Sequence, residues 1–351
     1  MKKAIALITS VVMGASLLQA CSSGNKDNET KTEKKNDFKI GMVTGMGGID
    51  DKSFNQSTWE GLQEFAKNHN LKVGEDVRYT ASNSDADYVP GLSQYAENKY
   101  DLAIGVSFLI GDAVKDVAKT FPEQKFAIVD SVVEEPNVAS ITFKEHEGSF
   151  LAGVAAGMQT KSNKVAFVGG VKSDLIRKFE TGFKAGVKTV NPKAEVMVQY
   201  VGNFEDAAKG TAIANSLYGQ GVDVIFHAAG GSGNGIFTEA KNRSSKGEKV
   251  WVIGVDRDQH EEGLPENVTL TSMVKKVNLA VRDISEKTLE GKFPGGETVE
   301  YGLKEDGVGL SEKTENLSKE IQDKVKEVTD KIKNGEIVVP STEKELKAYK
   351  F

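Results

Sequence analysis

From residue 38 onward, short apolar runs alternate with longer segments whose apolar residues recur at helical spacing. The short runs have strand-like length and cover residues 38–44, 77–81, 102–107, 126–130, 138–143, 164–168, 195–201, 222–227 and 249–256. The helical segments between them cover residues 58–68, 88–98, 110–120, 148–159, 176–189, 206–218 and 235–242. Strands that alternate with helices predict βαβ units and a mainly parallel sheet.

The same pattern occurs twice in the same order. Four pairs of segments match at a nearly constant offset: 39–45 with 164–170, 79–83 with 199–203, 98–105 with 220–227, and 125–130 with 250–256. One such match would carry little weight, but four in order predict an α/β protein with two Rossmann-like lobes of similar topology. Because open parallel sheets bind ligands at the carboxyl ends of their strands, a cleft between the lobes is the expected binding site.

The remaining pattern completes the two lobes. It predicts strands at 269–274 and 300–303 and an amphipathic helix at 314–333. We expect an N-terminal lobe of residues 38–145 plus 257–303 and a C-terminal lobe of residues 146–256 plus 304–351. The chain would then cross between the lobes near 143–148, 256–259 and 301–305.

The N-terminus has the pattern of an export signal with an anchor. Lys2 and Lys3 precede an apolar run over residues 4–18, which is short for a membrane span but typical of a signal-peptide core. The run ends at Leu-Gln-Ala before Cys21, which resembles a bacterial lipobox. We therefore expect a signal peptide at 1–20 and lipid on Cys21, followed by a polar tether up to residue 37. The alternative is an ordinary signal peptide with a chance cysteine.

The composition of the chain excludes several classes of function. The chain has 351 residues, which suits two domains, and a single cysteine, which excludes a disulfide framework and a Cys-ligated zinc site. A net charge of −6 argues against nucleic-acid binding through phosphate neutralisation. No spacing of the four histidines suggests a nucleophile and base pair, and no metal motif is present. We expect no catalytic residues, no metal and no cofactor.

An aromatic residue follows a strand in each of the two halves. Phe54 lies in the loop after the first strand, and Phe204 follows the strand at 195–201. If both face the cleft they can sandwich a planar ligand, because ring stacking contributes about 1–3 kcal/mol per base. The alternative for Phe54 is ordinary core packing.

Asp50 is a candidate cap for the next helix, with Ser57 as the alternative cap.

Polar residues at strand ends would then select the ligand. Asp130 and Asp256 are equivalent in the duplication, and each can accept two donors from a ring edge or a ribose diol, or else serve as a helix cap or surface charge. Lys275 can pair with Asp256. The glycine run at 230–235 matches neither phosphate-binding fingerprint, and the surrounding carboxylates favour a neutral nucleoside over a nucleotide.

The segments 41–44, 49–56 (IDDKSFNQ), 230–235 (GGSGNG) and 252–259 (VIGVDRDQ), with the lipobox, resemble the basic membrane protein family of purine-nucleoside-receptor-type lipoproteins. The resemblance covers essentially all of 38–351 and implies the type I periplasmic-binding-protein fold with a hinge. It implies stacking by Phe54 and Phe204. The residues that it implies at the ring edge are Asp50, Asp51, Asn55 and Asp130, and those at the ribose are Ser107, Gly230, Asp256 and Lys275. This sequence departs from the family pattern in its more aliphatic segment 107–112 and in Ser232, where threonine is frequent.

These observations predict a monomeric, membrane-anchored binding protein on the extracytoplasmic face. It would capture guanosine, inosine or adenosine and deliver them to an ABC permease. The alternatives are a binding protein or sensor for another solute such as a sugar, and a nucleoside hydrolase. An adhesion or host-interaction role would leave no motif, so the sequence leaves it open.

Overall fold

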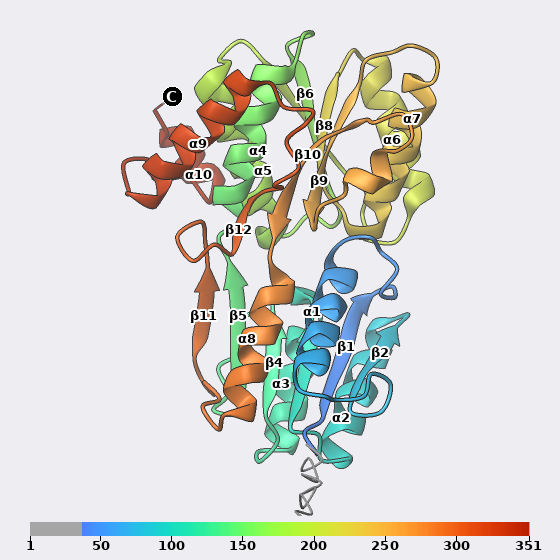
Figure 1. Cartoon of the computed structure of the whole chain (residues 1–351), viewed down its shortest axis with the longest axis vertical. Helices are drawn as coiled ribbons and strands as arrows, with labels where there is room; N and C mark the ends of the chain where they lie inside the picture. The colour runs from blue at the N-terminus through green and yellow to red at the C-terminus, as the bar shows by residue number, and fades with distance from the viewer. Residues whose placement is uncertain (1–36, 351) are drawn as a thin grey trace, which may run out of the picture. The chain divides into compact units, whose positions relative to one another are not determined.

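The computed structural model describes residues 37–350. The expected signal peptide, the lipidation site Cys21 and all but the last residue of the expected tether lie outside the described residues. Within this range the chain forms two six-stranded sheets, each with helices on both faces (Figure 1). The α/β class and the two-lobe architecture predicted from the sequence are confirmed.

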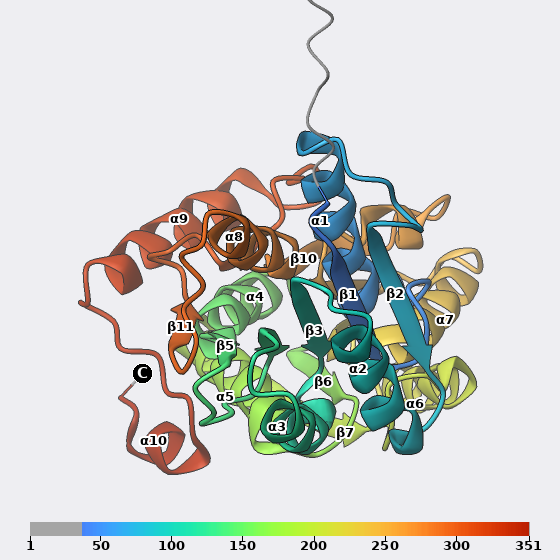
Figure 2. The ribbon, with the colours of Figure 1, turned by 90° about the horizontal axis from the view of Figure 1, so that it is seen from below.

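The first sheet belongs to the N-terminal lobe. Its order is β11 (Thr298–Tyr301), β5 (Val138–Phe143), β4 (Phe126–Val129), β3 (Leu102–Val106), β1 (Ile40–Met46) and β2 (Val77–Ser82), with all pairs parallel. Its helices are α1 (Phe54–Asn68), α2 (Tyr88–Glu97), α3 (Gly111–Thr120) and α8 (Val277–Leu289). Helices α1 and α8 pack against each other, and α2 and α3 cover the other face (Figure 2).

The second sheet belongs to the C-terminal lobe. Its order is β12 (Val308–Leu310), β10 (Thr269–Lys275), β9 (Trp251–Asp256), β8 (Val224–Ala228), β6 (Lys164–Gly169) and β7 (Glu195–Tyr200), and only the β10–β12 pair is antiparallel. Its helices are α4 (Glu145–Gln159), α5 (Asp174–Val190), α6 (Ala207–Gly219), α7 (Asn234–Ser244), α9 (Lys319–Lys333) and α10 (Glu343–Ala348). Helix pairs α4–α5 and α6–α7 pack tightly together.

The expected second crossing between the lobes was wrong. It was placed near 256–259, but β10 pairs with β9 in the second sheet, with Val274 opposite Asp256. The chain therefore leaves the C-terminal lobe only after Lys275 and enters α8 of the first lobe at Val277. The reason is that the duplication includes a fifth strand: β10 occupies in the second sheet the place that β5 occupies in the first. The crossings after β5 and between β11 and β12 fall where they were expected.

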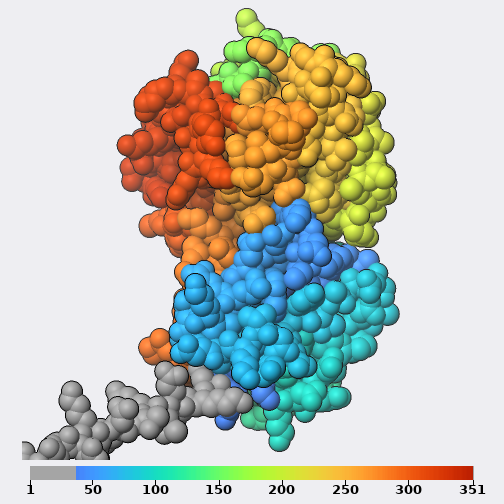
Figure 3. Space-filling view, turned by 45° about the vertical axis from the view of Figure 1, so that its right-hand side comes forward, coloured from blue at the N-terminus to red at the C-terminus, as the bar shows by residue number. Residues whose placement is uncertain are grey.

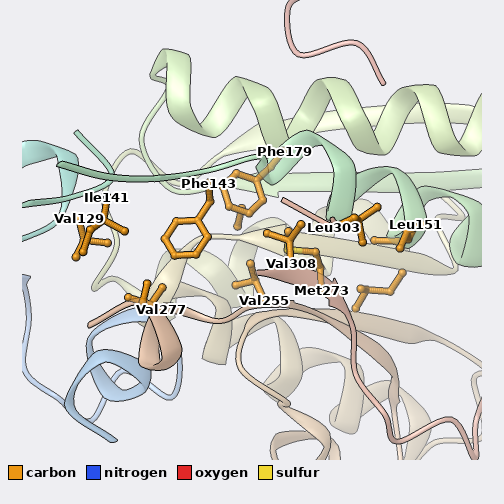
Figure 4. Packing of buried hydrophobic residues seen from close by; sticks show 14 of the residues in the cluster. Val129, Ile141, Phe143, Leu151, Phe179, Val255, Met273, Val277, Leu303 and Val308 are labelled. Atoms are coloured by element: carbon orange, nitrogen blue, oxygen red, sulfur yellow. The ribbon is translucent and has the colours of Figure 1, made fainter. Parts of the chain in front are cut away.

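Apolar packing continues from one lobe to the other at these crossings. Phe143 ends β5 and lies close to Phe179 of α5, while Val255 and Met273 come from the second sheet (Figure 4). These side chains are almost fully buried and belong to one hydrophobic cluster. Burying such side chains contributes about 1.5–3 kcal/mol each, so the region around the crossings is a stable support for the loops beside it.

Candidate functional site

A cavity lies between the carboxyl ends of the two sheets. Residues of both lobes line it, among them Phe54 of α1 and Phe179 of α5. Nine of the ten residues predicted to bind the ligand line it: Asp51, Phe54, Asn55, Ser107, Asp130, Phe204, Gly230, Asp256 and Lys275. These residues come from both lobes. Figure 3 shows the two lobes in contact, with the blue segment of the first lobe against the orange and yellow surface of the second.

The tenth predicted residue, Asp50, is exposed and does not line the cavity. Nor does Asp50 or Ser57 cap the helix, because α1 begins at Phe54, earlier than the predicted residue 58. Asp51 takes that role. Its carboxylate accepts the backbone N–H groups of Ser53 (3.0 Å), Asn55 (2.8 Å) and Gln56 (3.0 Å). Burial raises the pKa of Asp51, and these donors oppose the rise.

The two predicted aromatic residues share the cavity. Phe54 is the first residue of α1 and Phe204 lies in the loop between β7 and α6, so each lobe contributes one ring. Both rings are partly buried and also pack against the main core. The Phe204 ring lies so close to Gly170 that a Cβ atom there would be 2.2 Å from it. Its ring partner is Phe108, edge-on with 6.2 Å between centroids.

Several apolar cavity residues were not predicted as site residues. Phe179, Leu175 and Ile176 reach the cavity from α5, which the sequence analysis treated only as a helix. Phe108 directly follows the predicted residue Ser107, in the segment that departs from the family pattern. A helical repeat of apolar residues does not distinguish core packing from cavity lining, whereas the position of Phe108 directly after a strand was a usable signal.

Lys275 is the cation of the site. It is 1% exposed, and its Nζ donates to both carboxylate oxygens of Asp130 at 2.6 Å and lies 3.3 Å from Glu145 Oε1. The predicted partner was Asp256, so Asp130 corrects that pairing. Burial lowers the pKa of Lys275, but the carboxylates of Asp130, Glu145 and Asp256 outweigh burial and raise it. The ammonium group therefore remains charged. Glu145, which is fully buried, also faces Lys178 at 3.4 Å.

Lys275 also lies over aromatic rings. Its Nζ is 5.1 Å from the centroid of Phe54, 4.9 Å from that of Phe143 and 5.7 Å from that of Phe179. Cation–π contacts of this length contribute about 0.5–2 kcal/mol and fix the side chain against one wall of the cavity.

Asp256 is the structural counterpart of Asp130. Both end a parallel strand in the left-handed region, with φ of 67° and 70°, a conformation that aspartate tolerates better than most residues. Ser53 Oγ donates a hydrogen bond across the cleft to Asp256 Oδ2. Burial raises the pKa of Asp256 to about 7, while Lys275 and Ser53 act in the opposite direction. Ser53 was not predicted, because a serine in a capping loop gives no sign of its partner in another lobe.

The amide of Asn55 has a fixed orientation. Its Nδ2 donates to the carbonyls of Met46 (3.4 Å) and Gly48 (3.3 Å), which leaves Oδ1 buried without a partner among the described residues. Asn55 therefore offers the cavity an acceptor. Ser107 has a φ of 138°, and its Oγ accepts from the backbone N–H of Leu109.

The set of groups limits the chemistry of a ligand. The acceptors are carboxylates and one amide oxygen, and the only cation lining the cavity among the described residues is Lys275. Each lobe also contributes aromatic side chains to the lining. This arrangement suits a flat, uncharged molecule with several donors. Across residues 37–350, no cluster of His, Cys, Asp or Glu has a metal-binding arrangement, and no helix is long and apolar enough to cross a membrane.

The doubly wound lobes and the cavity between them define a two-lobe solute-binding protein. The structure resembles the crystal structure of an ABC transporter solute-binding protein from Aeropyrum pernix K1. The TM-score is 0.79 with 27% sequence identity, and the match covers 89% of this chain and 96% of that one.

Sequence comparisons then place the chain in a family. The profile of the Bmp family, described as ABC transporter substrate-binding protein PnrA-like, matches residues 38–343. The chain is 49% identical to the CD4+ T-cell-stimulating antigen of Listeria innocua, over 88% of this chain and 90% of the relative. It is 44% identical to the ABC transporter nucleoside-binding protein BmpA of Lactococcus lactis, over 88% and 91%. The chain belongs to the Bmp family of ABC transporter substrate-binding proteins, as the sequence analysis predicted.

Proposed function

We propose that this protein binds purine nucleosides, among them guanosine, inosine and adenosine, in the cavity between its lobes and delivers them to an ABC permease. The observation that carries the proposal is that Phe54 and Phe204, from different lobes, line one cavity with Asp130, Asp256 and Lys275. The name of the Lactococcus lactis relative, a nucleoside-binding protein, supports it.

In this proposal the two rings hold the two faces of the purine. Asn55 Oδ1 and the Asp130 carboxylate accept N–H groups from the edge of the base, since both are acceptors. Asp256 accepts a ribose hydroxyl and Lys275 donates to one, with Ser107 and Gly230 beside the sugar. Asp51 lines the same wall, although three of its acceptor positions are used by α1.

The charge of the cavity favours nucleosides over nucleotides. Asp51, Asp130 and Asp256 contribute carboxyl groups, and the one cation, Lys275, is already paired with Asp130. A phosphate would enter a region of like charge and low dielectric, where repulsion is poorly screened. Charge does not distinguish a nucleoside from an uncharged sugar, so sugars are included in the test.

Isothermal titration calorimetry of the full chain in detergent tests the proposal. We expect micromolar or tighter binding of guanosine, inosine and adenosine, which requires about 8 kcal/mol, and at least tenfold weaker binding of guanosine monophosphate. Binding of ribose or galactose with no response to any nucleoside would reject the proposal. We further propose that the protein is not an enzyme and does not hydrolyse nucleosides. Chromatography after incubation with inosine should therefore reveal no hypoxanthine.

We also propose that the protein acts as a monomer held to the extracytoplasmic face of the membrane by lipid on Cys21. The support is the lipobox-like sequence that ends at this residue, the only cysteine of the chain. Cells expressing the Cys21→Ser variant should release the protein into the soluble fraction, and labelling with an alkyne fatty acid should disappear. Unchanged membrane retention and labelling of that variant would contradict the anchor.

A further inference from the structure

Gln259 is a fully buried glutamine outside the cavity that connects the two lobes. It follows β9, in the second lobe, and does not line the cavity. Its Oε1 accepts the backbone N–H of Val255 at 2.8 Å and contacts His227 Nε2 at 3.0 Å. Its Nε2 donates across the cleft to the backbone carbonyl of Lys52 at 2.9 Å.

The contacts within the second lobe fix the orientation of this amide. The Val255 N–H is always a donor, so the atom that it meets must be the amide oxygen of Gln259. Burial lowers the pKa of His227 to about 4, so its ring is neutral at pH 7 and Nε2 carries the proton that it donates. With the oxygen occupied by two donors, the NH₂ group of Gln259 must face Lys52.

A second amide reaches the same loop. Asn234, the first residue of α7, donates from Nδ2 to the backbone carbonyl of Asp51 at 3.2 Å. Two consecutive carbonyls of the first lobe therefore accept side-chain amides from two separate elements of the second lobe. Lys52 has a φ of 60°, and its neighbour Asp51 caps the helix that begins at Phe54. The loop that carries the stacking ring is thus held from the opposite lobe.

We propose that Gln259 and Asn234 are positioning residues that clamp the loop at 47–53 and hold the lobes closed, and so set how slowly a bound ligand leaves. Neither residue lines the cavity, so their contribution is to the closed state and not to ligand contact. A ligand that binds the closed state gains apparent affinity in proportion to the population of that state. The proposal rests on the proposed function only in the choice of guanosine as the probe.

The test uses Gln259→Glu, which keeps an oxygen for Val255 and His227 but removes the donor to Lys52, and Asn234→Ala. Gln124→Glu is the matched control, because Gln124 is also buried and donates to a backbone carbonyl, that of Lys125, within one lobe. Hydrogen–deuterium exchange of the ligand-free full chain reports the loop at 47–56. Stopped-flow measurements at pH 8 report guanosine release.

We expect both cleft variants to exchange several-fold faster at 47–56 and to release guanosine about tenfold faster than wild type, with little change in association rate. The control should lose stability at most, with wild-type loop exchange and release. Wild-type exchange and release in both cleft variants would overturn the proposal. If Gln259→Glu fails to fold, Asn234→Ala decides. If wild type does not bind guanosine, the proposed function fails. Hydrogen–deuterium exchange of the ligand-free variants then still tests whether Gln259 and Asn234 hold the loop at 47–53.

Discussion

At the scale of single residues, the duplicated pair Asp130 and Asp256 has acquired two different environments. Both have the same backbone conformation at the end of a strand. Asp130 forms a two-oxygen ion pair with Lys275, whereas Asp256 receives one hydroxyl donor, from Ser53, and burial raises its pKa to about 7. Asp256 is therefore partly protonated near neutral pH, which makes it a pH-sensitive group of the site.

The raised pKa of Asp256 has a consequence for stability. Between its ordinary pKa of 3.8 and about 7, the folded protein keeps a proton that the unfolded chain has lost, so the free energy of unfolding falls as pH rises through this range. Asp256→Asn removes this loss. We therefore compare the melting temperatures of the ligand-free variant and ligand-free wild type. The difference, variant minus wild type, should become more positive by several degrees between pH 4 and pH 8. A difference that is constant with pH would contradict the assignment.

The aromatic rings give the second prediction at this scale. Phe54→Ala and Phe204→Ala should each weaken guanosine binding about 10- to 100-fold, because each removes one stacking face worth about 1–3 kcal/mol. Phe121→Ala is the control, since Phe121 is partly buried in the first lobe and does not line the cavity. Titration calorimetry measures the change. Equal effects of all three substitutions would mean that loss of folding, not loss of stacking, is being measured.

At the scale of elements, the start of α1 shows how a local interaction places a site. The Asp51 carboxylate accepts the backbone N–H of Ser53, just before the helix, and those of Asn55 and Gln56 in its first turn, and so fixes where the helix begins. The sequence predicted a cap in this loop but chose the wrong residue, because two adjacent aspartates are equivalent in a pattern. Only the course of the backbone decides which one reaches the free N–H groups.

Asp50 and Asp51 therefore form a matched pair for mutation. Asp51→Ala should lower the free energy of unfolding by about 1–2 kcal/mol, as loss of a helix cap does, and should weaken guanosine binding by displacing Phe54. Asp50→Ala should change neither quantity, since Asp50 is exposed and outside the cavity. Urea denaturation and calorimetry measure both. Equal losses of stability in the two variants would contradict the assigned cap.

The same scale explains what the sequence could and could not predict. Strand and helix positions follow from local periodicity, so the nine strands first expected all occur in the structure. The sheet to which β10 belongs depends on a neighbour far away in sequence, which periodicity does not report. Recognising the fifth repeated strand would have corrected it. Nine of the ten residues predicted to bind the ligand line the cavity, because strand-end loops of parallel sheets converge. Glu145, Ser53 and Gln259 were not predicted, because their partners lie in other segments.

At the scale of the whole described chain, the lobes are joined by three crossings and by side chains that bridge the cleft. Lys275 lies at the second crossing and Glu145 directly after the first, so their contact links two connecting segments. Ser53, Gln259 and the half-buried pair Arg257–Glu60 (2.9 Å) bridge the cleft itself. The lobes are therefore linked both by fully buried side chains and by an ion pair that solvent reaches.

A protein that closes on its ligand is stabilised by it. At a guanosine concentration 100 times its dissociation constant, mass action adds about 2.7 kcal/mol to the free energy of unfolding. We expect the melting temperature of the full chain to rise with guanosine concentration and to be insensitive to cytidine at equal concentration. A shift of the same size with both would show that the cavity does not select purines.

The most direct measurement of the central claim is a crystal structure of the protein with guanosine. The account predicts the purine ring between Phe54 and Phe204, its edge at Asn55 and Asp130, and its ribose at Asp256 and Lys275. Guanosine bound elsewhere, or a purine in the cavity in contact with neither ring, would contradict it.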